Sequence, residues 1–229
     1  MILIFPGFWT EPADYQIITE PLTSRGKNVE VVDLFSPQSH WPAPCPWAEW
    51  EEKLVRKIKS MPLQPTQILG YSLGARLVLN LRITGALNTP SILLSVHPGL
   101  IPESERQVRL KSDRAWAEKF RILPWPELHK LWNNQAVFQE TKLLEKRYHN
   151  FDREKLAASL EHFSLGLQAD QRMELNKLPL KTCTWVVGEK DEKFVKLTDD
   201  LKTISLIRVP SAGHRVLWDQ PQRILEMLE

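Results

Sequence analysis

Residues Gly70–Arg76 read "GYSLGAR" and place Ser72 between two glycines. The preceding "TQIL" (66–69) has the length and apolar character of a buried strand, and the following "ARLVLNL" (75–81) has the apolar spacing of a helix. A Gly-x-Ser-x-Gly sequence between a strand and a helix is typical of the nucleophile elbow, a sharp turn with a strained serine and small neighbours. We therefore interpret Ser72 as a nucleophile or a base; a plain strand-to-helix turn is the alternative.

The rest of the chain alternates short apolar runs with amphipathic stretches, which predicts an α/β fold with a mostly parallel sheet flanked by helices. The predicted strands are Ile2–Phe5, Val29–Leu34, Thr66–Gly70, Ser91–Val96, Cys183–Gly188 and Ile204–Val209. Predicted helices cover Trp47–Ser60, Gly74–Gly85 and Arg215–Glu229, the last interrupted or restarted at Pro221.

Residues 101–177 break this alternation, because charged, helix-like segments follow one another there with no convincing strand between them. We expect one domain over residues 1–229, with residues 101–177 as a helical lid inserted between strands. A separate helical domain is the weaker alternative, since strands resume after the insert.

An elbow serine requires an acid and then a histidine later in the chain. Asp191, in "VVGEKDEKF" (186–194), follows a predicted strand, and His214, in "VPSAGHRVL" (209–217), follows the next one. Asp191 would orient His214, which would take and return the Ser72 proton. Asp191 could instead be a helix cap, and Glu189 is a weak rival for the acid. The other histidines, which lack this position in a Gly-His turn near the C-terminus, are His40, His97, His129, His149 and His162.

This order predicts the α/β-hydrolase fold and an oxyanion site made of two backbone N–H groups. Leu73, which follows the serine, would supply one of them. Phe8, in "IFPGFWTEP" (4–12), would supply the other. Many relatives of this fold have His-Gly where this chain has Pro6-Gly7, which affects the hydrogen bonding of that loop.

Arg76 lies one helical turn after Ser72, so both side chains can face one pocket. A guanidinium binds carboxylates in a bidentate manner, which indicates an acidic substrate. A surface ion pair is the alternative role for Arg76.

Composition excludes several classes of function. A net charge of +2 over 229 residues gives no reason to expect nucleic acid or a membrane surface as partner. The two cysteines, Cys45 and Cys183, form no metal-binding pattern, and no dinucleotide or P-loop motif occurs, so we predict neither a metal nor a cofactor. "MILIF" (1–5) is too short for a signal core, which predicts a cytoplasmic protein; the oligomeric state is open.

Several motifs give the chain a resemblance to a known family. They are "GYSLGAR" (70–76), "HPGL" (97–100), "RLKSDRAWAEKF" (109–120), "LWNNQAVF" (131–138), "SLGLQ" (164–168), "GEKDEKF" (188–194) and "AGH" (212–214). Together they resemble the 2-succinyl-6-hydroxy-2,4-cyclohexadiene-1-carboxylate synthases of menaquinone biosynthesis, from the first strand to the last helix.

The resemblance implies a lyase on a hydrolase scaffold. Such an enzyme eliminates pyruvate from 2-succinyl-5-enolpyruvyl-6-hydroxy-3-cyclohexene-1-carboxylate, with the triad serine as base, so the expected partner is a small polycarboxylate. By motif, Tyr71 and Arg76 would lie beside the substrate, and Arg109, Trp132 and Arg147 would reach it from the lid.

The residues themselves leave alternatives for the lid. Arg106, Lys111 and Arg114 compete with Arg109, Trp132 could be a core residue, and Arg147 could pair with Glu145 or Asp152. Two alternative functions also stay open: a carboxylesterase or thioesterase with Ser72 as covalent nucleophile, and a non-catalytic anion-binding module.

Overall fold

A parallel six-stranded sheet organises the chain. The computed structural model describes residues 1–139, 141–178, 182–199, 201 and 205–229. The strands are β1 (Ile2–Phe5), β2 (Val29–Val31), β3 (Gln67–Tyr71), β4 (Ser91–Leu94), β5 (Cys183–Gly188) and β6 (Ser205–Val209). They pair in the order β2-β1-β3-β4-β5-β6, and every pair is parallel. The predicted α/β class and parallel sheet are confirmed.

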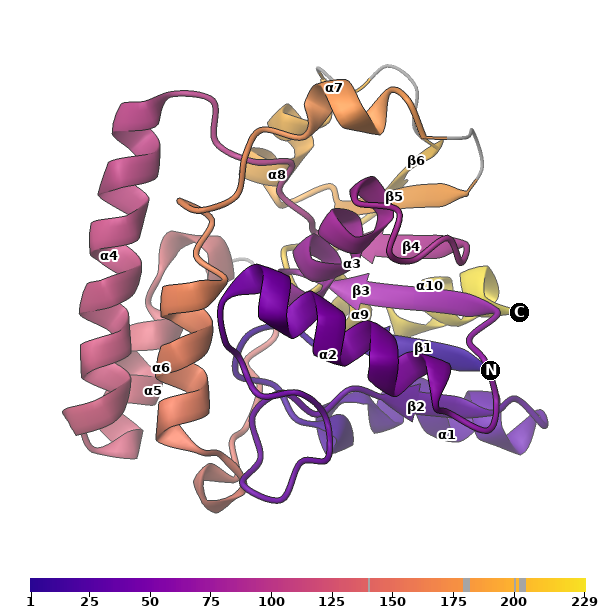
Figure 1. Cartoon of the computed structure of the whole chain (residues 1–229), viewed down its shortest axis with the longest axis horizontal. Helices are drawn as coiled ribbons and strands as arrows, with labels where there is room; N and C mark the ends of the chain where they lie inside the picture. The colour runs from indigo at the N-terminus through magenta and orange to yellow at the C-terminus, as the bar shows by residue number, and fades with distance from the viewer. Residues whose placement is uncertain (140, 179–181, 200, 202–204) are drawn as a thin grey trace.

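Both faces of the central strands β1, β3, β4 and β5 are almost fully buried, which is why these strands are apolar runs rather than alternating ones. On one face, Leu3, Phe5 and Ile68 pack in a cluster with the residues of α2 (Trp47–Lys59) and α3 (Leu73–Ile83). On the other face, Ile4 and Leu69 pack with α1 (Gln16–Ser24), α9 (Val216–Asp219) and α10 (Pro221–Leu228). The sheet is therefore the middle layer of three (Figure 1).

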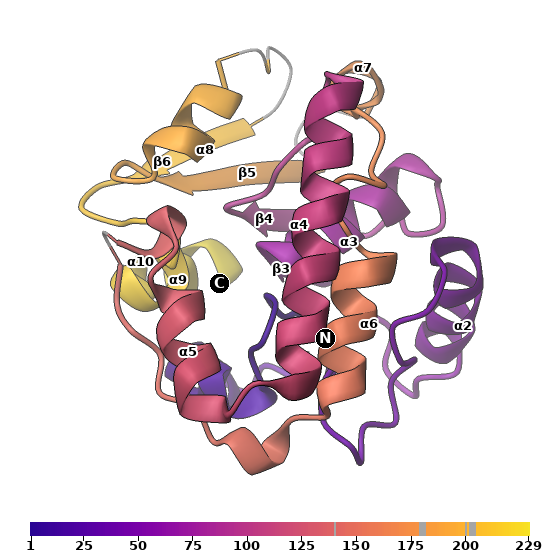
Figure 2. The same ribbon diagram turned by 90° about the vertical axis from the view of Figure 1, so that its left-hand side faces the viewer.

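Helices fill the chain between β4 and β5. They are α4 (Glu103–Ile122), α5 (Trp125–Asn133), α6 (Arg153–His162) and α7 (Arg172–Leu175), with the 3₁₀ turns η2 (Ala136–Phe138) and η3 (Tyr148–Asn150). The described residues of this segment contain no strand. Helices α4, α5 and α6 stand together at the end of the sheet toward which the strands point, and both chain termini lie at the opposite end (Figures 1 and 2).

The remaining elements are η1 (Pro12–Tyr15) and α8 (Glu192–Leu197), which follow β1 and β5 in the chain. In the helices that the structure describes, no segment is both long and apolar enough to cross a membrane. Cys45 and Cys183 are free thiols.

Candidate active site

The turn after β3 gives Ser72 an unusual backbone. Its φ is 50°, and it is the N-cap of α3, so the strand reverses into the helix at this residue. A Cβ on Gly70 would lie 2.6 Å from the Cα of Ala75, and one on Gly74 would lie 2.2 Å from the carbonyl oxygen of Phe5. Larger residues would therefore push α3 away from β1 and β3, and this is the physical reason for both glycines in the motif.

Three side chains from separate parts of the sequence form a hydrogen-bonded chain at this turn. Ser72 Oγ lies 3.1 Å from His214 Nε2, and His214 Nδ1 lies 2.7 Å from Asp191 Oδ2. His214 and Asp191 are both buried, which strengthens their interaction. The arrangement can move a proton between the serine hydroxyl and the imidazole while the carboxylate holds the ring in place.

The structure distinguishes between the roles considered for the acidic residues. Asp191 is the N-cap residue of α8, yet its side chain makes no capping hydrogen bond and faces His214 instead. Glu189 is exposed. The backbone carbonyl of His214 accepts a hydrogen bond of 2.8 Å from Ser95 Oγ, which anchors the loop that carries the imidazole.

A cavity of about 650 Å³ opens beside Ser72. Phe8 and Leu73, the predicted oxyanion donors, both line it. Leu73 is the first residue of α3, so its N–H has no acceptor within that helix. The loop that carries Phe8 is held by Tyr15, whose hydroxyl accepts from Gly7 N at 2.9 Å, and by Thr10, whose hydroxyl donates to the Gly7 carbonyl at 2.8 Å. These bonds hold the Pro6-Gly7 loop without a histidine.

Arg76 lines the same cavity. Its guanidinium donates to the side-chain oxygen of Gln168 at 3.1 Å and to the backbone carbonyl of Phe163 at 2.8 Å, both neutral acceptors. Burial, with a smaller contribution from the charge of Arg109, lowers the pKa of Arg76 to about 9. No ion pair between Arg76 and a carboxylate occurs in the described part of the chain, so the surface-ion-pair role does not apply. The charge of Asp113, which pairs with Arg109 in the same cavity, acts on Arg76 only from beyond ion-pair distance.

Arg109 and Trp132 reach the cavity from the helical insert. Arg109 Nε lies 2.8 Å from both carboxylate oxygens of buried Asp113, which leaves its terminal nitrogens to face other groups. Among the rivals of Arg109, Arg106 binds the Gly166 carbonyl and Glu103, while Lys111 and Arg114 are exposed. The ring of Trp132 packs against Phe8 at 4.8 Å, so this residue is both a packing residue and part of the wall.

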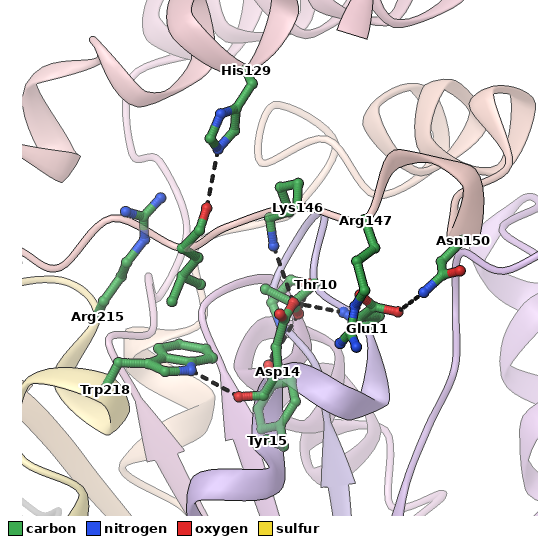
Figure 3. A network of polar contacts seen from close by, with 12 residues as sticks. Thr10, Glu11, Asp14, Tyr15, His129, Lys146, Arg147, Asn150, Arg215 and Trp218 are labelled. Carbon is green, nitrogen blue, oxygen red and sulfur yellow. Dashed lines mark hydrogen bonds and ion pairs between the residues drawn. The ribbon is translucent and has the colours of Figure 1, made fainter. Parts of the chain in front are cut away.

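Two residues expected beside the substrate do not line this cavity. The structure places Arg147 in an ion pair with Glu11, 2.9 Å away, rather than with Glu145 or Asp152, and Figure 3 shows this pair beside Asn150. Buried Glu11 needs a cationic partner, which explains where Arg147 points. Tyr71 is buried in a second pocket of about 50 Å³, which also touches Ser72.

Sequence reasoning missed several residues of the cavity wall. Ser95 and Lys193 received no role, and His97 was considered only as a rival of His214. Gln168, in the quoted "SLGLQ" segment, also received no role, although its side chain contacts Arg76 of the wall. His97 is buried, and burial together with the charges of Lys193 and Arg76 lowers its pKa to about 3, so it is neutral at pH 7. Ser95 and His97 follow the end of β4, and Lys193 is two residues after Asp191. These positions were the signal that could have identified them as site residues.

No group of three or more His, Cys, Asp or Glu side chains suited to a metal ion occurs in the part of the chain that the structure describes. The cavity combines a hydrogen-bonded Ser–His–Asp chain with guanidinium groups. It can therefore move a proton to or from a bound molecule that carries negative charge.

Comparisons with known proteins identify the family and the fold of the chain. The model of the alpha/beta hydrolase family matches residues 2–227. A 2-succinyl-6-hydroxy-2,4-cyclohexadiene-1-carboxylate synthase from Escherichia coli O7:K1 is 30% identical over 182 residues, covering 76% of this chain and 71% of that protein. A protein of the same name from Salmonella enteritidis is 34% identical over 168 residues, covering 70% of this chain but only 66% of its own length.

Among solved structures, MenH from S. aureus superposes with a TM-score of 0.82 at 20% identity, covering 100% of this chain and 91% of that one. That likeness establishes the fold, and the sequence relatives establish the narrower group. The chain belongs to the alpha/beta hydrolase family and, within it, to the 2-succinyl-6-hydroxy-2,4-cyclohexadiene-1-carboxylate synthases.

Proposed function

We propose that the chain eliminates pyruvate from 2-succinyl-5-enolpyruvyl-6-hydroxy-3-cyclohexene-1-carboxylate and so forms 2-succinyl-6-hydroxy-2,4-cyclohexadiene-1-carboxylate. The observation that carries the proposal is the charge of Arg76, which has only neutral hydrogen-bond partners and lies in the same cavity as Ser72. A neutral ester gives no reason for such a group, whereas a polycarboxylate supplies the missing negative charge. The names of the sequence relatives support the same reaction.

In the proposed reaction Ser72 is the base. Its own proton passes to His214 Nε2, and the resulting oxygen takes a proton from the substrate ring. The electron pair left on carbon moves through the ring double bond and breaks the bond to the enolpyruvyl oxygen, which leaves a conjugated diene. The released enolate takes up a proton and becomes pyruvate.

The other residues of the cavity would stabilise charges on the substrate and on His214 during the reaction. The N–H groups of Leu73 and Phe8 would stabilise negative charge delocalised from the carbanion, in the manner of an oxyanion site. Arg76 and Arg109 would hold substrate carboxylates. Asp191 keeps the imidazole oriented and stabilises it when protonated.

The test is release of pyruvate from the enolpyruvyl substrate by the purified protein, followed with a coupled lactate dehydrogenase assay. Ser72→Ala should lower kcat/KM by about 10³-fold or more, since it removes a member of a cooperating triad. Normal turnover by this variant contradicts the proposal.

The same geometry is compatible with covalent catalysis, and the assay separates the two. A carboxylesterase or thioesterase would accumulate an acyl-Ser72 intermediate and release no pyruvate. A non-catalytic anion-binding module would bind the substrate and change neither it nor an ester.

A further inference from the structure

The side-chain amide of Gln168 is buried and contacts Arg76, the cationic residue nearest to Ser72 in the sequence. It follows α6 in the loop that also contains Phe163. Its side-chain oxygen accepts from Arg76 Nη1 at 3.1 Å, while Arg76 Nη2 donates to the Phe163 carbonyl at 2.8 Å. These contacts use two of the five guanidinium donors, so the other three can serve a ligand.

The orientation of the amide is fixed by its other contacts. Gln168 Nε2 donates to the backbone carbonyl of His97 at 3.1 Å and to the side-chain oxygen of Gln171 at 3.0 Å. Gln171 in turn donates to the side-chain oxygen of Asn80, on α3. Because both neighbours of Nε2 are acceptors, only the oxygen of Gln168 can face Arg76.

The two arginines of the cavity differ in the charge of the groups that anchor them. Arg109 is also anchored, but by the carboxylate of Asp113, so its charge is balanced locally. Arg76 is anchored by an amide and a peptide carbonyl, so its geometry is fixed without neutralisation. A glutamate has nearly the same shape as glutamine, and it would place a carboxylate in direct contact with Arg76.

We propose that Gln168 is a positioning residue: it holds the Arg76 guanidinium in place through a neutral hydrogen bond and thereby keeps its charge available to a substrate carboxylate. Gln171 and Asn80 extend the amide chain and hold Gln168 in the required orientation. This role rests on the proposed function only in that it needs a polycarboxylate ligand.

The test compares Gln168→Glu with Gln168→Leu. Both substitutions abolish the donation to His97 and Gln171, and only the first adds a negative charge beside Arg76. We expect Gln168→Leu to raise KM for the enolpyruvyl substrate about threefold, because Arg76 loses one anchor. In Gln168→Glu, KM should be at least about tenfold higher than in Gln168→Leu. In both variants kcat should change much less than KM.

A matched control places the same chemical change elsewhere. Gln222→Glu, on the exposed first turn of α10, alters net charge equally and should leave KM within about twofold of the wild type. The rate at which a neutral fluorophosphonate labels Ser72 should stay the same in all variants, since it reports the triad rather than the anion site.

Binding of tricarballylate, a tricarboxylate probe, gives a readout independent of turnover. Its Kd, followed by tryptophan fluorescence, should follow the same order, with the weakest binding in Gln168→Glu. Equal KM and Kd for the Glu and Leu variants would overturn the role of charge, and a Leu variant identical to the wild type would overturn the positioning role. The Leu result stands even if Gln168→Glu does not fold.

The two proposals fail in different ways. If the wild type binds tricarballylate but releases no pyruvate, the proposed reaction is wrong and the probe still decides the role of Gln168. If it neither binds the probe nor releases pyruvate, both proposals are wrong.

Discussion

At the scale of single residues, two serines at the ends of neighbouring strands adopt left-handed backbone conformations. Ser72 after β3 and Ser95 after β4 both have a φ of 50°. Such conformations cost about 1–3 kcal/mol each and persist where the surroundings enforce them. Here the Ser72 N–H donates to Leu94 O at 2.9 Å and the Ser95 N–H to Val186 O at 2.8 Å, so each turn is held by the adjacent strand. One serine then faces His214 with its hydroxyl, and the other anchors the backbone of His214.

Two of the three arginines expected at the substrate, Arg76 and Arg147, should differ in how much their substitution changes KM. Arg76→Ala should raise KM for the polycarboxylate substrate at least about tenfold, because it removes a cation without an ion-pair partner from the cavity. Arg147→Ala should leave KM within about twofold, because that guanidinium pairs with Glu11 outside the cavity. Steady-state kinetics on both variants checks this, and a large KM effect at Arg147 would mean that it moves into the site.

His97 should make stability depend on pH. Its pKa is lowered from 6.5 to about 3, chiefly by burial, so the unfolded chain binds the proton more readily than the folded one. The contribution of His97 is therefore complete above pH 6.5 and declines as the pH falls toward 3. At pH 5 the loss is about 2 kcal/mol.

Urea denaturation at pH 7 and pH 5 measures this loss. In His97→Asn this part of the pH dependence of the free energy of unfolding should disappear, because asparagine does not titrate. An identical pH dependence in both proteins would show that the imidazole is not the source.

Part of the site could be predicted from residues alone. Ser72, Asp191 and His214 follow from one motif and a fixed chain order, and the structure brings them together. The neighbours of Arg76 could not be predicted, since Gln168 is 92 residues away in sequence and meets it only through tertiary packing. Arg147 was expected beside the substrate because of its motif. Its ion pair with buried Glu11 could not be predicted from the spacing of residues in the sequence.

At the scale of elements, β1, β3 and β5 were predicted to within one residue, whereas two other strands end earlier than predicted. Val29–Leu34 was expected as one strand, but β2 ends at Val31, and Ser91–Val96 shortens to β4 at Leu94. Beyond those points the apolar residues are buried in loops, so hydrophobicity alone overestimates strand length. For the last strand, Ile204 lies outside the described residues.

Helix α1 was not predicted. It contains Pro21 in its interior, and proline removes a backbone donor and usually ends or bends a helix. Here burial of Ile18 and Leu22 against the sheet outweighs that cost. At the C-terminus an interruption or a new helix start was predicted at Pro221, and α10 does begin there. Proline is favoured as the first residue of a helix.

Asp152 should be important for α6. Its side chain accepts hydrogen bonds from the N–H groups of Glu154 and Lys155, which have no partners within the helix. Asp152→Ala should lower the free energy of unfolding by about 1 kcal/mol, and Asp152→Asn by only a few tenths. Equal losses in thermal or urea denaturation would indicate a role other than capping.

At the scale of the whole molecule, acidic residues outside the helical insert hold it through two sets of polar contacts, in addition to the contacts of Arg76 and Gln168. Lys146 pairs with Asp14 at 3.0 Å, next to the pair of Arg147 and Glu11 (Figure 3). On the other side, Asp219 accepts from Thr141 Oγ1 at 2.9 Å and also from Gly213 N, adjacent to His214, at 2.9 Å. The position of the insert is thereby coupled to the loop after β1 and to the loop that carries the imidazole.

Removing Lys146 should weaken the whole fold. Its side chain is 5% exposed and that of Asp14 is 10% exposed, so Lys146→Met leaves a nearly buried carboxylate without its partner. We expect a loss of about 3–5 kcal/mol in the free energy of unfolding. The control Lys177→Met changes an exposed lysine and should cost less than about 0.5 kcal/mol.

Urea titration of these variants gives the comparison, and Lys146→Met combined with Asp14→Asn should recover part of the loss. A double variant no more stable than Lys146→Met would show that the isolated carboxylate is not what destabilises the fold.

The neutral neighbours of Arg76 also bear on how a catalytic cycle ends. In the proposed reaction one polyanion becomes two smaller anions, and each carries fewer negative charges than the molecule that entered. The cations of the protein stay as they were, so neither fragment is attracted as strongly as the intact precursor. Bond cleavage then itself favours product departure, and Arg76, which has no ion-pair partner of its own, is ready at once for the next precursor.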